Sequence, residues 1–266
     1  MDYSDIIKDG YKVQGYTRTK KDIILSAYKK GHNSRLYIYD QSSHKLKDVV
    51  TLNHKAHVGG VTYDPKNDCI FVTGSKGRLH AYKDKSFKEI ETDIKIDGIT
   101  PNNMATIFYF NGDLYTSTFG IRSHLIKIEY EFKKDFIKEI ETKEIAKIGL
   151  AVQGIALYKD YLVASQSYGK NNKSRLITYD LANKMKVLSR RNVIHSGLEG
   201  IYVDNDGNLT GVFEFGKQSI QNFGNIELFK YSARGFTPIN KSKMLFGTLL
   251  FEINRKKKRK KFKNLD

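Results

Sequence analysis

The sequence contains no tryptophan, one cysteine and three prolines among its 266 residues. A single cysteine, Cys69, excludes an intramolecular disulfide framework. It lies in the apolar run Cys-Ile-Phe-Val, which predicts a buried side chain and not a nucleophile. The longest hydrophobic run, residues 244–251, is too short to cross a bilayer. The first residues, MDYSDIIKDGYKVQG, lack the apolar core of a signal peptide. A cytoplasmic location is therefore expected, or an extracellular one if a leader has been removed.

Acidic residues are scarce relative to basic ones, since 29 Asp and Glu against 46 Lys and Arg give a net charge of +17. Such a charge favours encounters with anionic polymers and membrane surfaces without specifying one. Residues 254–266 form a basic tail whose composition predicts a disordered segment. The tail is either a solvated end or a polyanion-binding segment. Its basic residues are Arg255, Lys256, Lys257, Lys258, Arg259, Lys260, Lys261 and Lys263.

A repeated stretch organises the chain. Residues 14–40 and residues 153–180 both run through Gln-Gly, an apolar segment ending in Ser, a Gly/Asn loop and Ser-Arg-Leu-x-x-Tyr-Asp. Three weaker copies begin at His57, Asn103 and Glu199. Counted with the starting points Gln14 and Gln153, the five copies begin 43 to 50 residues apart. This regular period indicates one supersecondary unit that is used repeatedly.

Each copy is predicted to form a small antiparallel sheet, because apolar residues recur at every second position and Asn/Asp/Gly turns separate the first two strands. Outermost strands are predicted at four polar segments, residues 45–52, 87–94, 136–145 and 184–193. Four strands repeating every forty to fifty residues or so are typical of a β-propeller blade. We therefore predict one all-β domain over residues 1–253, a β-propeller with five four-stranded antiparallel blades. Residues 6–13 or 244–253 would complete the last blade. Six blades are the alternative, if residues 232–253 form more of a blade.

The starting points of the copies carry a family resemblance. Gln153-Gly-Ile, Glu199-Gly-Ile and His57-Val-Gly-Gly-Val each precede a strand and an Asp/Asn/Gly turn. In this they resemble the innermost strands of a broad β-propeller superfamily, which includes NHL-repeat proteins, the senescence-marker (SMP-30)/gluconolactonase group and strictosidine-synthase-like proteins. The resemblance covers residues 14–231. It implies the fold and no single activity, because the superfamily includes lactonases, lyases, synthases and binding modules.

The first residue of each copy is expected to point towards the propeller axis. One side chain per blade would then meet in a polar ring able to bind a small ligand, a metal ion or ordered water. The ring comprises Gln14, His57, Asn103, Gln153 and Glu199. Gluconolactonase-like proteins use an axial divalent metal, and the resemblance implies calcium ligands at Glu199 and Asn103. The ring offers one carboxylate, fewer than hard cations usually have. A metal-assisted hydrolase, lactonase or lyase, with Glu199 at its centre and His57 as base, is therefore the alternative interpretation.

Other side chains are predicted to lie near the channel mouth. Tyr28 and Tyr168 follow the second strands and could stack on a sugar or a base. Three arginines open third strands and would form a basic ring for an anionic ligand, or ion pairs across blades with Asp40 and Asp180; they are Arg35, Arg78 and Arg175. Serines at the ends of second strands are expected to line the mouth, namely Ser26, Ser165 and Ser167. A zinc site would need His54, His57 and His195, which no Cys or HExxH motif accompanies.

No Gly-x-Ser-x-Gly elbow, phosphate-binding glycine loop or dinucleotide fingerprint occurs in the sequence. The repeat and the lack of a catalytic constellation favour a non-catalytic binding module without a cofactor, acting as a monomer. Its partner is expected to be a protein or a glycan, bound at the axial mouth or on a loop face. Binding of an anionic polymer or membrane surface through the tail is a further alternative.

Overall fold

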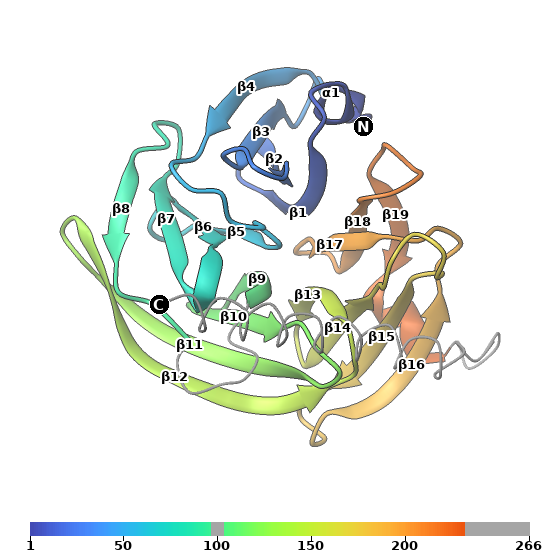
Figure 1. Ribbon diagram of the computed structural model, residues 1–266. Coiled ribbons are helices and arrows are strands. Elements are labelled where there is room, and N and C mark those ends of the chain that lie inside the picture. Colours follow the sequence, from blue (N-terminus) through green and yellow to red (C-terminus); the bar gives the residue numbers. More distant parts are fainter. Residues whose placement is uncertain (97–103, 232–266) are drawn as a thin grey trace, which may run out of the picture.

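The computed structural model describes residues 1–96 and 104–231 (Figure 1). These two ranges consist mostly of β-strands, which confirms the predicted all-β class. They contain one five-residue helix, α1 (Ser4–Lys8), and two short 3-10 helices, η1 (Ser75–Gly77) and η2 (Ile226–Tyr231). No helix within them is long and apolar enough to cross a membrane.

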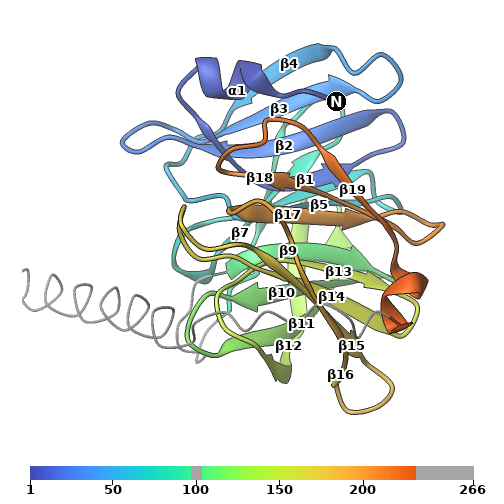
Figure 2. The ribbon, with the colours of Figure 1, turned by 90° about the vertical axis from the view of Figure 1, so that its right-hand side faces the viewer.

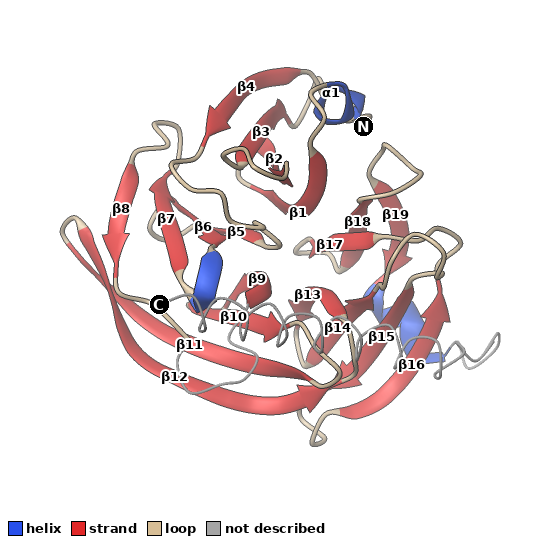
Figure 3. Ribbon diagram, in the orientation of Figure 1, coloured by secondary structure: helices blue, strands red, loops and turns tan. Residues whose placement is uncertain are grey.

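The strands form successive antiparallel groups that radiate from a common centre (Figure 3). The first group is β1 (Lys12–Arg18), β2 (Asp22–Tyr28), β3 (Arg35–Asp40) and β4 (Leu46–Thr51). The second is β5 (Val61–Asp64), β6 (Cys69–Thr73), β7 (Leu79–Lys83) and β8 (Glu89–Thr92). The third is β9 (Met104–Phe110), β10 (Asp113–Thr118), β11 (Ser123–Lys133) and β12 (Phe136–Ile148). The fourth is β13 (Val152–Tyr158), β14 (Tyr161–Gln166), β15 (Arg175–Asp180) and β16 (Lys186–Asn192). The fifth is β17 (Leu198–Val203), β18 (Asn208–Phe213) and β19 (Gln221–Asn225).

The core consists of apolar layers between neighbouring groups. Ile24 of β2 and Ile70 of β6 belong to one layer, and Phe71 of β6 and Ile126 of β11 belong to the next. Because both faces of the inner strands are covered in this way, these strands read as nearly continuous apolar runs. The four polar segments predicted as outermost strands are β4, β8, β12 and β16, so this prediction is confirmed.

The inner strands β1, β5, β9, β13 and β17 contact one another in a closed ring. Their glycines permit this close approach. A Cβ atom on Gly60 would lie 2.4 Å from the backbone nitrogen of Ile107, and one on Gly200 would lie 2.7 Å from that of Tyr16. Real Cβ atoms do not come so close to backbone. The Gly that recurs at the start of four of the five repeats is therefore explained by packing at the axis.

The second and third groups are joined into one eight-stranded sheet. Strand β12 runs parallel to β8 where Phe136 pairs with Glu91 and Ile137 with Thr92. Beyond this point, two bulges opposite β11 leave Ile140 and Ile145 without a pairing partner on β11. Both side chains are exposed, as expected for bulges that disrupt a sheet edge.

The N-terminal residues close the molecule between the first and fifth groups. Asp2 pairs with Ser219 in an antiparallel bridge, just before β19. The Tyr3 hydroxyl accepts a hydrogen bond from the Phe213 backbone N–H (3.0 Å) and donates to the Lys217 carbonyl (2.9 Å). Helix α1 lies beside the first group (Figure 2), and its Ile6 packs in the apolar layer that contains Val212 of β18.

The predicted role of residues 6–13 as the last strand of the fifth group is therefore wrong. This segment includes most of α1 and the start of β1, and the bridge to the fifth group comes from Asp2 instead. The other predicted closing segment, residues 244–253, lies outside the described residues.

Candidate binding site at the axis

A β-bulge interrupts the beginning of four inner strands. The residues skipped by strand pairing are Gln14 in β1, Ala105 in β9, Gln153 in β13, and Glu199 with Gly200 in β17. In the second group, the carbonyl of Gly60 accepts a hydrogen bond from the Thr73 backbone N–H, which places Gly59 at the matching position. Because the bulge falls at the same place in each strand, the skipped polar residues Gln14, Gln153 and Glu199 occupy equivalent positions, and the bulge re-aims their side chains.

The predicted polar ring is thus only partly assembled. Gln14, Gln153 and Glu199 hold equivalent positions, as the repeat indicated. His57 lies two residues before the equivalent Gly59. Asn103 lies outside the described residues, and Ala105 takes the equivalent place on β9. Two of the five positions therefore have no polar side chain.

Glu199 and Gln14 are deeply buried, with 3% and 1% of their surface exposed. The Gln14 Nε2 donates to the carbonyl of Val13 (2.9 Å), and its Oε1 has no hydrogen-bond partner among the described residues. Burial raises the pKa of Glu199 well above its ordinary value of 4.5, and repulsion from Glu214 adds to the shift. Lys12 opposes it. The site therefore favours a neutral carboxyl group.

The three polar residues at the axis offer one carboxyl group and two amide oxygens, fewer than the roughly six to eight oxygen ligands that calcium takes. No group of three or more His, Cys, Asp or Glu in residues 1–96 and 104–231 is placed to hold a metal ion. The described residues thus supply no donor set for the metal-assisted mechanism centred on Glu199.

Two predicted residues, Tyr28 and His57, lie with three others where the inner strands begin, at the end of the axis that we call the N-terminal mouth. Its residues are Lys12, Tyr28, His57, Glu214 and Phe215. The His57 ring packs on Tyr28, with ring centres 4.6 Å apart. Lys12 Nζ forms an ion pair with Glu214 (2.7 Å) and lies 4.9 Å from the centre of the Phe215 ring. Loss of hydration lowers the pKa of His57, and the charge of Glu214 opposes this shift.

The predicted zinc site is not assembled, because its three histidines have different surroundings. His54 stacks on His80, with ring centres 3.9 Å apart, whereas His57 packs on Tyr28. His195 meets the edge of Phe213. The short spacing of His54 and His57 in the sequence therefore does not bring the two rings together around one metal ion.

Two of the predicted channel-lining serines, Ser26 on β2 and Ser165 on β14, instead contact the start of the next repeat, and the hydroxyl of Ser167 has no hydrogen-bond partner among the described residues. Ser26 and Ser165 are completely buried, and Ser167 is 1% exposed. The Ser26 hydroxyl donates to the carbonyl of Val58 in the next repeat (2.8 Å). That of Ser165 lies 3.4 Å from the carbonyl of Glu199 in the next repeat. Their position explains why small hydroxyl residues recur there without a catalytic role.

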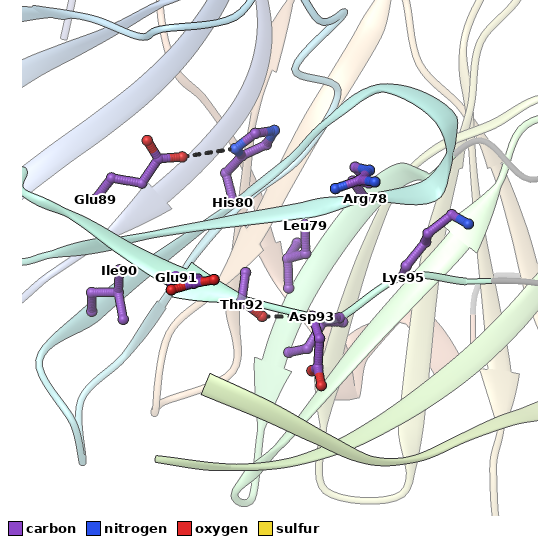
Figure 4. Close-up of a pocket in the computed structure, with 10 residues that line it drawn as sticks. Arg78, Leu79, His80, Glu89, Ile90, Glu91, Thr92, Asp93 and Lys95 are labelled. Carbon is purple, nitrogen blue, oxygen red and sulfur yellow. Dashed lines mark hydrogen bonds and ion pairs between the residues drawn. The ribbon is translucent and has the colours of Figure 1, made fainter. Parts of the chain in front are cut away.

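The three arginines predicted to form a basic ring have different surroundings. Arg35 forms an ion pair with Asp9 (3.0 Å), so the predicted pair with Asp40 is wrong for this residue. Arg175 is 9% exposed, and burial together with Arg190 lowers its pKa. Arg78 is exposed at the edge of an open hollow between β7 and β8, beside the hydrogen bond between His80 Nδ1 and the Glu89 carboxyl group (Figure 4).

Two predictions remain, the stacking role of Tyr168 and the basic tail. Tyr168 is half-buried, and its carbonyl accepts a hydrogen bond from the side chain of Asn172 (2.7 Å). The polybasic residues 255–263 lie outside the described residues.

A hollow that the sequence did not indicate lies at the other end of the axis, where all five inner strands end. We call it the funnel. It has a volume of about 630 Å³ and is lined by residues from every group. These are Thr17–Lys20, Thr62, Tyr63, Pro65, Phe108–Asn111, Leu157–Lys159 and Tyr202–Asn205. A signal for it exists in the sequence, because an aromatic residue recurs near the end of each inner strand.

Arg18 is the most distinctive cation of the funnel. Its Nε donates to the Tyr16 hydroxyl (2.5 Å), which also accepts a hydrogen bond from Thr210 (3.2 Å). The guanidinium carbon lies 5.7 Å from the ring centres of both Tyr16 and Tyr202. No carboxylate among the described residues forms an ion pair with Arg18. The aromatic pair thus holds a half-buried positive charge without neutralising it.

The other two cations of the funnel are paired. Lys20 lies 3.6 Å from Asp68, and Lys159 lies 2.7 Å from Glu227. The one carboxylate in the lining, Asp204, accepts hydrogen bonds from the backbone N–H groups of Asp206 and Asn208 in its own turn. Arg18 is therefore the one cation of the described lining without an ion-pair partner, and Asp204 brings a negative charge to the same hollow.

Comparisons with known proteins place the fold. The sequence matches no protein-family model and no curated protein. A protein of unknown function from Bacteroides thetaiotaomicron is similar in structure, with a TM-score of 0.54 and 12% identity over 79% of this chain and 58% of that one. The WD40 repeats of RRP9 are similar with a TM-score of 0.50 and 9% identity, over 83% of this chain and 78% of that one.

A third structure, Kuenenia stuttgartiensis hydrazine synthase, is aligned with a TM-score of 0.46 and 13% identity over 79% of this chain. The chain spans 61% of the length of that protein and 58% of the Bacteroides protein. At these identities the likeness concerns the fold alone. The likeness to the Bacteroides protein and to the WD40 repeats, together with the radial groups of strands, shows a β-propeller-like fold.

Proposed function

We propose that the protein is a five-bladed β-propeller that acts as a non-catalytic binding module, with the funnel as its binding surface. The observation that carries this proposal is the meeting of all five inner strands around one hollow. Concave sites that combine aromatic walls with a few polar groups are the common form of ligand pockets. The partner is expected to be a protein or a glycan, bound by a monomer. Kinship with the NHL and gluconolactonase-like propellers, supported by Gln153-Gly-Ile and Glu199-Gly-Ile, is part of the proposal.

Tyrosine footprinting can distinguish the two ends of the axis. Hydroxyl radicals modify accessible tyrosines, and half-buried tyrosines are present at both ends. Tyr109 and Tyr158 line the funnel, whereas Tyr28 belongs to the N-terminal mouth. In an extract of the source cells, modification of Tyr109 and Tyr158 should fall, while that of Tyr28 stays unchanged. Protection of Tyr28 alone would reject the funnel as the binding surface.

The tail supports a second, separate proposal, in which residues 255–263 bind anionic polymers or membrane surfaces. Eight of these nine residues are Lys or Arg. Removal of the chain after Ile253 should flatten the dependence of heparin or DNA affinity on salt concentration, because fewer counterions would be released. An unchanged salt slope in the shortened protein would contradict a role for the tail.

A further inference from the structure

We propose that the funnel recognises an acidic peptide segment, whose carboxylate binds the guanidinium of Arg18. This inference rests on the proposed function, since it names the chemistry of the ligand for the same surface. Its basis is the position of Arg18, which projects from the end of β1 into the lining of the funnel.

The geometry around Arg18 prepares the guanidinium for an incoming anion. Its Nε is occupied by the Tyr16 hydroxyl, and the Tyr16 and Tyr202 rings are arranged edge to face with centres 5.6 Å apart. No hydrogen bond within the described ranges involves the two terminal nitrogens of Arg18. Two parallel N–H groups match the two oxygens of a carboxylate. The fixed Nε reduces the side-chain entropy that binding would otherwise cost.

The charge pattern favours a peptide carboxylate over a nucleic acid strand. A nucleic acid needs several cations along its backbone, with aromatic faces for its bases. Among the described residues of the lining, Lys20 and Lys159 have carboxylate partners and Asp204 is hydrogen-bonded in its own turn, so Arg18 is the cation there without an ion-pair partner. The aromatic walls can pack against the aliphatic part of a glutamate and its neighbours. The amides of Asn111 and Asn205, which also line the hollow, can bind peptide groups.

Nuclear magnetic resonance can observe this contact directly in the full chain. The Nε–Hε signal of Arg18 is assigned by its loss in the Arg18→Gln variant. We would titrate the protein at 0.15 M salt or so with the peptide Ac-Ala-Glu-Ala-Glu-Ala-NH2, using Ac-Ala-Gln-Ala-Gln-Ala-NH2 as the neutral control and inorganic phosphate as a third ligand. The glutamate peptide is expected to shift the Arg18 signal in a saturable manner, and the glutamine peptide to leave it in place.

Variants test whether the effect is local. Arg18→Gln should weaken binding of the glutamate peptide by about tenfold or more, because a charge-assisted bidentate contact is lost. Lys143→Gln removes the same charge from an exposed position on β12 and should leave the affinity unchanged. Similar melting temperatures for the two variants would show that both are folded.

Three results would overturn the inference. They are equal binding of the two peptides, unchanged affinity in Arg18→Gln, and saturable binding of phosphate with no effect of the glutamate peptide. The last result would assign the site to phosphate groups. If footprinting protects Tyr109 and Tyr158 while any of these results is obtained, the binding surface stands and only its ligand chemistry is wrong.

Discussion

At the scale of single residues, the axis contains a carboxyl group whose surroundings favour the protonated form. Burial raises the pKa of Glu199 above the 4.5 of an ordinary glutamic acid. Between 4.5 and the folded-state pKa, the native protein binds more protons at this group than the unfolded chain does. Stability therefore falls as the pH rises through this window. Below this window Glu199 does not change the stability, and above it the stability stays lower by a constant amount.

We predict that the Glu199→Gln variant is more stable than the natural protein, and that this difference grows as the pH rises. The neutral amide avoids the cost of a buried charge, so the variant and the natural protein should have equal stability near pH 4. Above pH 4.5 or so, the advantage of the variant should grow by at most about 1.4 kcal/mol per pH unit. Urea unfolding between pH 4 and pH 8 measures this difference. Glu141→Gln, at an exposed position on β12, is the control, and an identical pH trend in both variants would refute the account of Glu199.

At the scale of elements, the inner strands approach one another through glycine backbone. We predict that Gly200→Ala destabilises the protein by about 1–3 kcal/mol, because the new methyl group would lie 2.7 Å from the Tyr16 nitrogen and 3.0 Å from two backbone atoms of Gly15. Denaturant midpoints measure the loss. Gly31→Asn is the comparison, since Gly31 has open space around it and a positive φ that Asn tolerates. A loss in Gly31→Asn as large as that in Gly200→Ala would show that the close approach of the strands is unimportant.

The strands themselves could be predicted from the sequence, because polar outer strands and apolar inner strands leave a clear pattern. The alignment of the inner strands could not. In the second and third copies the equivalent positions hold Gly59 and Ala105, which carry no polar side chain, and the polar residues that the repeat pattern selects, His57 and Asn103, lie two positions earlier in the sequence. The funnel was also missed, because aromatic residues such as Tyr202 look like ordinary core when only the periodicity is known.

At the scale of the whole molecule, the ring is closed by the N-terminal residues. The hydroxyl of Tyr3 is completely buried and bonds to backbone groups of Phe213 and Lys217. Closure therefore depends on contacts between the two ends of the described chain. The sequence did not indicate this role, since one short bridge and a one-turn helix leave no periodic pattern.

We predict that Tyr3→Phe lowers the free energy of unfolding by about 1–3 kcal/mol, because the N–H of Phe213 loses its buried acceptor. Tyr28→Phe is the matched control, since the Tyr28 hydroxyl forms no hydrogen bond within the described residues. Hydrogen exchange at Phe213 should also become faster in Tyr3→Phe. Equal stability of the two variants would mean that the N-terminal contacts do not hold the ring closed.

The most direct test of the account is site-specific photocrosslinking to the partner in living source cells. A photoreactive residue at Asn205, exposed in the lining of the funnel, is compared with one at Lys143, exposed on the outer strand β12. The account predicts a discrete adduct from position 205 that excess unlabelled protein competes away, and no such adduct from position 143. Adducts formed from position 143 and absent at position 205 would contradict the claim that the protein binds its partner through the funnel.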